Sequence, residues 1–338
     1  MKNWIYIIYI GLVGCLVSSC QQSLDEVVQE STIGKAEISF TIALDDIDSR
    51  SRVSWEDSES ELDSEIGSVN DNQIDLSSEN GLQVFVYTLD GTTLLGEVTD
   101  KDIYKISTNV YKFNGKLSIQ NLASETLQCR LMVFANCTNG TETFNYNVQY
   151  IPMWGVKETT LKLAKGELTD ITEPIYLLRA MAKVEVKLDL SIAEDFDITS
   201  VKVNKYNVYG NVLPNGASAA TSTEEMNLDA VFNPNVEDSG TDLYFTKVTD
   251  DEFYVYLPEY DNSIPATIKV EIDKKFYEIK FENYVDGKAS GDSYNLVRNH
   301  YYQYTITNVA EQSVEVNFTL KYQVMDWTNI TNPGLSFE

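Results

Sequence analysis

Residues 35–44 read Lys35-Ala-Glu-Ile-Ser-Phe-Thr-Ile-Ala-Leu44, and this stretch decides the fold class of the chain. Its bulky apolar residues occupy every second position: Ile38, Phe40, Ile42 and Leu44. Successive side chains of a β-strand point to opposite faces of its sheet. The alternation therefore predicts a strand with one buried face.

The same period of two recurs along the rest of the chain, for example at 82–89, 127–135, 182–190, 267–281 and 314–324. Asn114-Gly115, Asn139-Gly140 and Asp273-Lys274 mark expected turns between strands. No window of twelve or more residues has the spacing of an amphipathic helix. With 338 residues, enough for about two domains, we expect a mainly β fold with two β-sandwich domains in tandem, at 35–180 and 181–338.

The chain is strongly acidic. It has 52 acidic and 25 basic residues, for a formal net charge of -27, which repels nucleic-acid phosphates and argues against nucleic acid as a partner. Twelve acidic residues lie between 45 and 80, where the only basic residues are Arg50 and Arg52. Charge at this density does not fit a core, so residues 45–80 are predicted to form a long exposed loop.

Arg50 and Arg52 have two interpretations. An arginine in an accessible loop suits a trypsin-like protease, because such a loop can unfold into the protease cleft. Each arginine could equally be an ordinary solvated charge, and these two residues taken by themselves favour that second interpretation.

The first twenty residues are typical of an export signal. Lys2 precedes an apolar run of about 14 residues that ends at Val17, which is shorter than the roughly 20 residues of a membrane-spanning helix. Val17-Ser-Ser-Cys20 resembles a bacterial lipobox, in which the cysteine is acylated and becomes the first mature residue. We therefore expect a signal peptide at 1–19, lipidation at Cys20 and a tether at 20–34. An ordinary signal peptide that happens to contain a cysteine is the alternative.

The remaining residues offer little for catalysis or metal binding. The chain has one histidine, His300, and no nucleophile motif, and the acidic run at 71–75 lacks the glycine and glutamate of a calcium loop. Cys129 and Cys137 would lie about 26 Å apart on one strand, too far for a disulfide, which needs Cα atoms within about 7 Å. We expect free thiols, a structural histidine, no cofactor and no enzyme activity.

Several short motifs together resemble the fimbrillin family, the lipoprotein-derived subunits of type V pili in anaerobic Gram-negative bacteria. Besides Cys20 and an arginine soon after the first strand, they are Ile151-Pro-Met-Trp-Gly155, Leu178-Arg-Ala-Met-Ala-Lys-Val184, Leu296-Val-Arg-Asn-His-Tyr-Tyr302 and Tyr322-Gln-Val-Met-Asp-Trp327. The resemblance extends over nearly the whole chain, although each motif is short.

The resemblance implies transthyretin-like β-sandwich domains and assembly by donor-strand exchange. An arginine-specific protease would cut after Arg50 or Arg52, the displaced strand would carry Ile38, Phe40, Ile42 and Leu44, and a neighbouring subunit would fill the groove with its tail, represented here by Leu335 and Phe337. The implied partners are other fimbrial subunits, the protease and, through the lipid, the outer membrane. Pro333-Gly334 departs from a continuous donor strand.

Other roles stay open at this point. An anchor or tip subunit would keep its lipid or cap the filament. A glycan-binding surface lipoprotein, from a different functional class, would need a row of exposed aromatic side chains on one sheet face. A host protein or glycan ligand is compatible with each of these roles.

Overall fold

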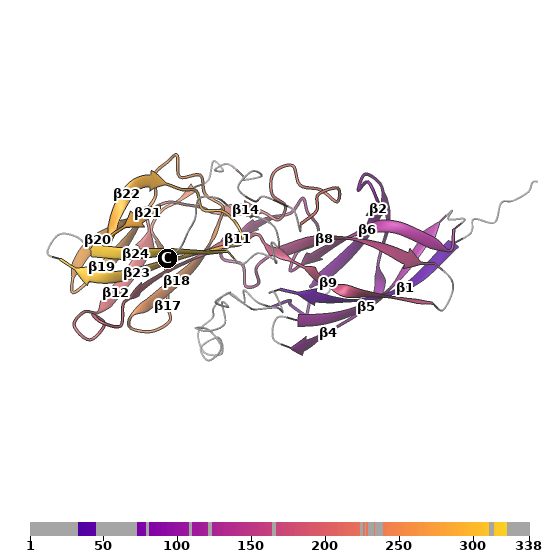
Figure 1. Cartoon of the computed structure of the whole chain (residues 1–338), viewed down its shortest axis with the longest axis horizontal. Helices are drawn as coiled ribbons and strands as arrows, with labels where there is room; N and C mark the ends of the chain where they lie inside the picture. The colour runs from indigo at the N-terminus through magenta and orange to yellow at the C-terminus, as the bar shows by residue number, and fades with distance from the viewer. Residues whose placement is uncertain are drawn as a thin grey trace, which may run out of the picture.

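A computed structural model describes residues 33–44, 73–78, 81–107, 110–120, 124–163, 167–223, 239–310 and 314–322, together with residues 226, 228 and 233. The named elements in these ranges are all β-strands (Figure 1). Among the same residues, no helix has the length and apolar character needed to cross a membrane. The mainly β fold predicted from the alternating pattern is confirmed.

Two sheets face each other in the N-terminal half, and their strands carry the indigo to magenta colours of Figure 1. The first has the order β4 (Thr99–Ser107), β5 (Val110–Gln120), β1 (Ile33–Ala43) and β9 (Leu168–Tyr176). The second has the order β10 (Leu178–Arg179), β8 (Met153–Lys162), β6 (Thr126–Ala135), β2 (Leu82–Thr88) and β3 (Leu94–Glu97). One apolar cluster, which includes Phe40, Phe113 and Leu131, fills the space between them.

A second pair of sheets forms the C-terminal half. One has the order β17 (Thr246–Lys247), β18 (Glu252–Pro258), β11 (Met181–Leu188), β23 (His300–Val309) and β24 (Val314–Tyr322). The other has the order β16 (Leu243–Tyr244), β12 (Ile198–Val203), β19 (Thr267–Ile272) and β20 (Lys275–Lys280). A separate core, with Val184, Ile268 and Tyr304 among its members, lies between these sheets. We keep 35–180 and 181–338 as the proposed domains.

The two halves meet through packing and a short strand pairing. A third apolar cluster combines Phe134 and Trp154 of the first half with Met181, Tyr256 and Tyr301 of the second. Nearby, β7 (Thr143–Asn145) pairs with β14 (Tyr209–Asn211). Two further small sheets are β13 (Tyr206–Asn207) with β15 (Ser239–Gly240), and β21 (Glu282–Val285) with β22 (Lys288–Ser293).

Two of the expected turns are present and one is not. The chain reverses between β19 and β20 at Asp273 and Lys274, which both have positive φ, and it turns again at Asn139–Thr141. The turn predicted at Asn114-Gly115 is wrong, because β5 runs straight through both residues. A Cβ atom at residue 115 would lie 2.4 Å from Val98 Cγ1. The glycine therefore serves close packing inside the sandwich and not chain reversal.

Candidate functional site

Strand β1 occupies the centre of the first sheet. It pairs antiparallel with β5, from Ile33 opposite Gln120 to Ala43 opposite Val110. On its other side it runs parallel to β9, from Glu37 opposite Leu168 to Ala43 opposite Tyr176. Since β5 and β9 are joined only through β1 in this sheet, removal of β1 would separate β9 from the β4–β5 pair. We call the place between β5 and β9 the β1 slot.

The inward side of β1 is almost completely removed from water. Ile38, Phe40 and Ile42 have exposed fractions of 0%, and Leu44 has 4%. The ring of Phe40 stacks on that of Phe113 of β5, with centroids 4.6 Å apart. The four residues predicted for the displaced strand therefore lie together on one face, in the core of the N-terminal sandwich.

The outward side of β1 is crossed by an ion pair between its two neighbours. Lys112 lies opposite Thr41 on β5, and Asp170 lies opposite Ser39 on β9. Lys112 Nζ lies 3.1 Å from the Asp170 carboxylate, and Ser39 below is buried. Because the carboxylate is largely exposed, the pair contributes at most about 1 kcal/mol. Apolar packing and the main-chain hydrogen bonds to β5 and β9 are therefore the main interactions that keep β1 in place.

The carboxyl end of β1 is fixed by the connection between the halves. Leu177 N donates a 3.3 Å hydrogen bond to the carbonyl oxygen of Ala43. Arg179 Nη1 donates another, also 3.3 Å long, to the carbonyl oxygen of Leu44. Leu44 is the last described residue before the acidic segment, so the point where the chain leaves the sandwich is defined by these two donors.

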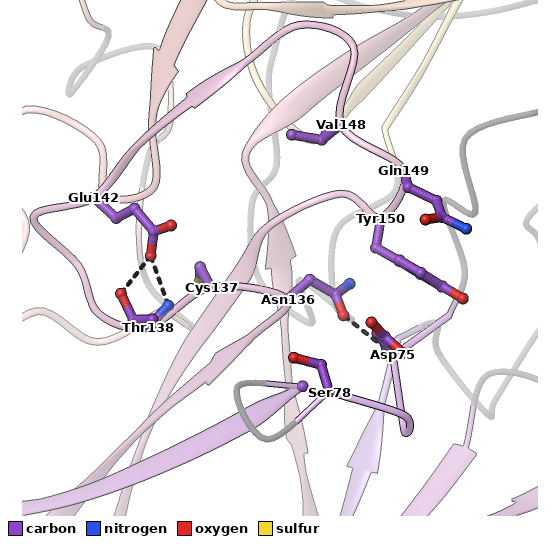
Figure 2. Close-up of a pocket in the computed structure, with 10 residues that line it drawn as sticks. Asp75, Ser78, Asn136, Cys137, Thr138, Glu142, Val148, Gln149 and Tyr150 are labelled. Atoms are coloured by element: carbon purple, nitrogen blue, oxygen red, sulfur yellow. Dashed lines mark hydrogen bonds between the residues drawn. The ribbon is translucent and has the colours of Figure 1, made fainter.

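The chain returns to the sandwich beside a small pocket, shown in Figure 2. Asn136 accepts a hydrogen bond from Asp75 N at 2.8 Å and donates to the carbonyl oxygens of Gln73 and Ile151, each at 2.9 Å. Ile74 is buried, and its N–H donates to the Tyr111 hydroxyl. The exposed loop predicted for 45–80 is therefore wrong over its last part, because an apolar side chain and an amide fix residues 73–75.

The pocket itself has a volume of about 320 Å³ and lies between Asp75, Asn136, Glu142 and Tyr150. Glu142 accepts hydrogen bonds from both the N–H and the hydroxyl of Thr138. The Asn136 amide uses its three hydrogen bonds on main-chain atoms. Within the described part of the chain, no group of three or more His, Cys, Asp or Glu side chains could hold a metal ion. The pocket is best explained as part of the structure that fixes the chain where it re-enters the sandwich.

Several site residues predicted from the sequence lie outside the described residues, so the roles assigned to them stay predictions. They are Cys20, Arg50, Arg52, Leu335 and Phe337. Two site residues were not predicted from the sequence: Arg179, which donates to Leu44 at the end of the displaced strand, and Asn136, which holds Gln73 and Asp75 of the returning chain. A lone arginine inside the apolar stretch 175–182 was a usable signal for a buried polar contact. Asn136 gave no such signal.

His300 is a structural group. It is buried, its Nδ1 lies 2.7 Å from the carbonyl oxygen of Arg298, and its ring lies against that of Tyr302. The exposed aromatic residues do not form a row, since Tyr104, Tyr209, Tyr244 and Phe276 lie on β4, β14, β16 and β20. The last two strands are at opposite edges of their sheet. The described surface thus lacks the aromatic row that a glycan platform would need.

Cys129 and Cys137 are free and buried in different apolar clusters. Burial raises the pKa of the Cys129 thiol to about 12 and raises the pKa of Cys137 as well. The thiolate is the reactive form, so alkylation of the folded chain should remain negligible even at mildly alkaline pH. We expect iodoacetamide to modify both residues only in concentrated urea, as measured by mass spectrometry of the peptides. Rapid native alkylation would contradict this burial.

Comparison with models of protein families and with curated proteins finds no match. Similar solved structures exist. A fimbrial assembly protein from Parabacteroides distasonis is 14% identical, with 86% of this chain and 97% of that chain covered and a TM-score of 0.47. A candidate cell adhesion protein from Bacteroides uniformis is 11% identical, with 72% and 91% covered and a TM-score of 0.45.

The fimbrial anchor protein Mfa2 from Porphyromonas gingivalis is also among these structures. It is 12% identical, with 72% of this chain and 89% of that chain covered and a TM-score of 0.29. The sequence identities of these three structures with the chain are all low.

Proposed function

We propose that the chain is a structural subunit of surface fimbriae which joins its neighbours by exchange of the strand in the β1 slot. One observation carries the proposal. A strand at the centre of a sheet, with its apolar face in the core, is connected to the rest of the sandwich only through the segment that contains Arg50 and Arg52. A single cut there would break the covalent link between β1 and the domain it completes.

The detached strand would leave two kinds of unsatisfied surface. The facing edges of β5 and β9 would expose unpaired main-chain groups, and the core would expose the apolar wall that β1 covers. An extended segment from another subunit satisfies both, because main-chain hydrogen bonds supply affinity and alternate side-chain sites supply specificity. We propose that the tail containing Leu335 and Phe337 of a neighbouring copy, or the corresponding segment of an accessory subunit, is this donor.

Export and surface location form the second part of the proposal. A lipid on Cys20 would hold the precursor at the outer membrane. Since Cys20 and β1 lie on the same side of the arginines, a cut at Arg50 or Arg52 would leave the subunit attached to the lipid only through the non-covalent hold of β1. Replacement of β1 would then release the subunit from the membrane and join it to the filament in one event. Such filaments would support cell adhesion.

The double substitution Arg50→Ala/Arg52→Ala is expected to abolish filament formation while the chain is still exported. Without an arginine between residues 45 and 72, an arginine-specific protease has no site at which to detach β1. Filaments are counted by electron microscopy of the source bacterium, and the N-terminus of the surface protein is sequenced.

The single variants Arg50→Ala and Arg52→Ala are the controls and identify the arginine that is cut. A mature protein that starts at Ser51 or Val53 supports the subunit role, whereas a blocked Cys20 on the unaltered protein would indicate an anchor. Normal filaments from the double variant would refute the proposal.

A further inference from the structure

Arg179 is buried to an extent that is unusual for its type. Its exposed fraction is 0%, in the two-residue strand β10 at the junction of the two halves. A guanidinium remains charged at any ordinary pH. A buried charge is tolerated only where hydrogen bonds replace those to water, so each group that accepts from Arg179 contributes to the stability of this junction.

One of those groups is a main-chain carbonyl of the strand that occupies the slot. Arg179 Nη1 donates to Leu44 O, and Leu177 N donates to the carbonyl immediately before it, that of Ala43. Both acceptors are backbone atoms. A replacement strand in the same register would therefore present the same two acceptors whatever its sequence.

Residues on both sides hold the main chain of Arg179 in place. Arg179 lies opposite Met153 of β8 in the second sheet, and its main-chain N–H donates to Asn299 Oδ1 at 3.0 Å. Asn299 N in turn donates to Met181 O at 2.8 Å. The main chain of Arg179 is thus fixed by the N-terminal sandwich and by the residues that precede β23. The side chain that carries the guanidinium extends from this fixed point.

A strand in the slot can slide by two residues without turning its apolar face outward. A shift of one residue reverses the faces and is strongly disfavoured, whereas a shift of two preserves the alternation and the spacing of the main-chain ladder. It moves residue 40 away from Phe113 but still places an apolar side chain there. For a strand that ends at position 44, a shift of two residues away from Arg179 leaves the guanidinium without this acceptor, so the end contact disfavours that register.

We propose that Arg179 is a positioning residue that holds the carboxyl end of whichever strand occupies the β1 slot, by binding the main-chain carbonyl at position 44. The inference deepens the proposed function and rests on it in one respect, namely that the strand is replaceable. The partner is thereby specified chemically: an extended segment with alternating apolar residues whose chain continues through at least one further carbonyl beyond the last ladder residue.

Two synthetic strands test this role. The first is residues 33–44 with a C-terminal amide, which keeps the Leu44 carbonyl. The second is residues 33–43 with a C-terminal isopentylamide, which keeps the leucine side chain and the Ala43 carbonyl and lacks only the carboxamide that contains the carbonyl at position 44. The full chain, cut at an engineered protease site within 53–70, is unfolded and refolded with an excess of either labelled strand. Native mass spectrometry measures how much strand displaces the chain's own residues 33–44.

The strand with the carbonyl is expected to compete about tenfold to a hundredfold better, the range for a hydrogen bond to a charged group. In an Arg179→Met chain, which keeps the apolar stem, the preference should fall to within about twofold. Equal competition by the two strands in the unaltered chain would overturn the proposal, and this comparison does not require that the variant folds. An undiminished preference in a folded Arg179→Met chain would overturn it as well.

The outcome is independent of filament formation. The assay needs only the purified chain and its own strand, so a preference for the carbonyl would stand even if the double arginine variant formed normal filaments in cells. Conversely, equal competition would remove the role of Arg179 and leave strand exchange itself unaffected.

Discussion

A chain that lacks residues 1–44 is expected to lose the folded N-terminal sandwich while the C-terminal sandwich persists. Burial of Ile38, Phe40, Ile42 and Leu44 contributes roughly 1.5 to 3 kcal/mol each, or about 6 to 12 kcal/mol together. This is comparable with the roughly 5 to 15 kcal/mol that stabilise a whole domain. The C-terminal sandwich has its own core, to which β1 contributes nothing.

Hydrogen exchange measured by mass spectrometry distinguishes the two halves. Amides of β5 and β9, which pair with β1, should exchange at nearly the rate of an unfolded chain, whereas those of β11, β18 and β23 should stay protected. Protection of β5 and β9 should return when a peptide of residues 33–44 is added. Full protection of the shortened chain without peptide would show that β1 is dispensable for the fold.

A chain that is cut between residues 45 and 72 but keeps its strand is the matched control. Here the core contacts, both ladders and the contacts of Leu177 and Arg179 with the end of β1 are all intact. We therefore expect this chain to retain nearly native exchange. Cleavage alone would then not open the slot, and strand replacement would proceed most easily when the incoming strand enters as the old one leaves.

The sequence predicted the local character of β1 but not its place in the sheet. The alternation of apolar residues at 38–44 depends only on the geometry of a strand with one buried face, so the buried side was identified correctly. Its neighbours β5 and β9 begin more than sixty residues further along the chain. No period in the sequence indicates which strands pair at such distances, because that choice is made by the packing of the whole sandwich.

The wrong turn at Asn114-Gly115 has a specific cause. Asparagine followed by glycine favours tight hairpins because both residues accept positive φ. In β5 the glycine is instead selected by crowding, since the Phe113 ring and Val98 fill the space where a side chain would lie. A short motif could not distinguish the two reasons, because the closest of these contacts is with Val98, 17 positions earlier in the sequence.

The substitution Phe40→Ala is expected to destabilise the N-terminal sandwich by about 3 to 5 kcal/mol. The Phe40 side chain is completely buried and stacks on Phe113. Its truncation removes apolar contacts and leaves a cavity in the core. The cavity cannot close unless the ladders of β1 with β5 and with β9 both shift. The same change weakens the hold of the slot on β1, so a foreign strand should also displace the variant strand faster.

The measurement must report on one half of the molecule, because a chain with two cores need not unfold in one step. Cys129 provides a local probe, since it lies in the same apolar cluster as Phe40. Pulse alkylation of Cys129 in increasing urea gives the midpoint at which this core opens. With a slope of about 1 to 3 kcal/mol per molar urea, the expected loss lowers that midpoint by at least about 1 M.

Phe276→Ala is the matched control, because it removes the same side chain from a position that is 66% exposed on β20. Its effect on the Cys129 midpoint should be negligible, since it lies outside the N-terminal core and buries little apolar surface. Equal midpoints for Phe40→Ala and Phe276→Ala would mean that the stacked ring contributes nothing to the slot. The hold on β1 would then have to come from its main-chain ladders and its end contacts, and the choice of an incoming strand would depend on its length and register more than on its central side chain.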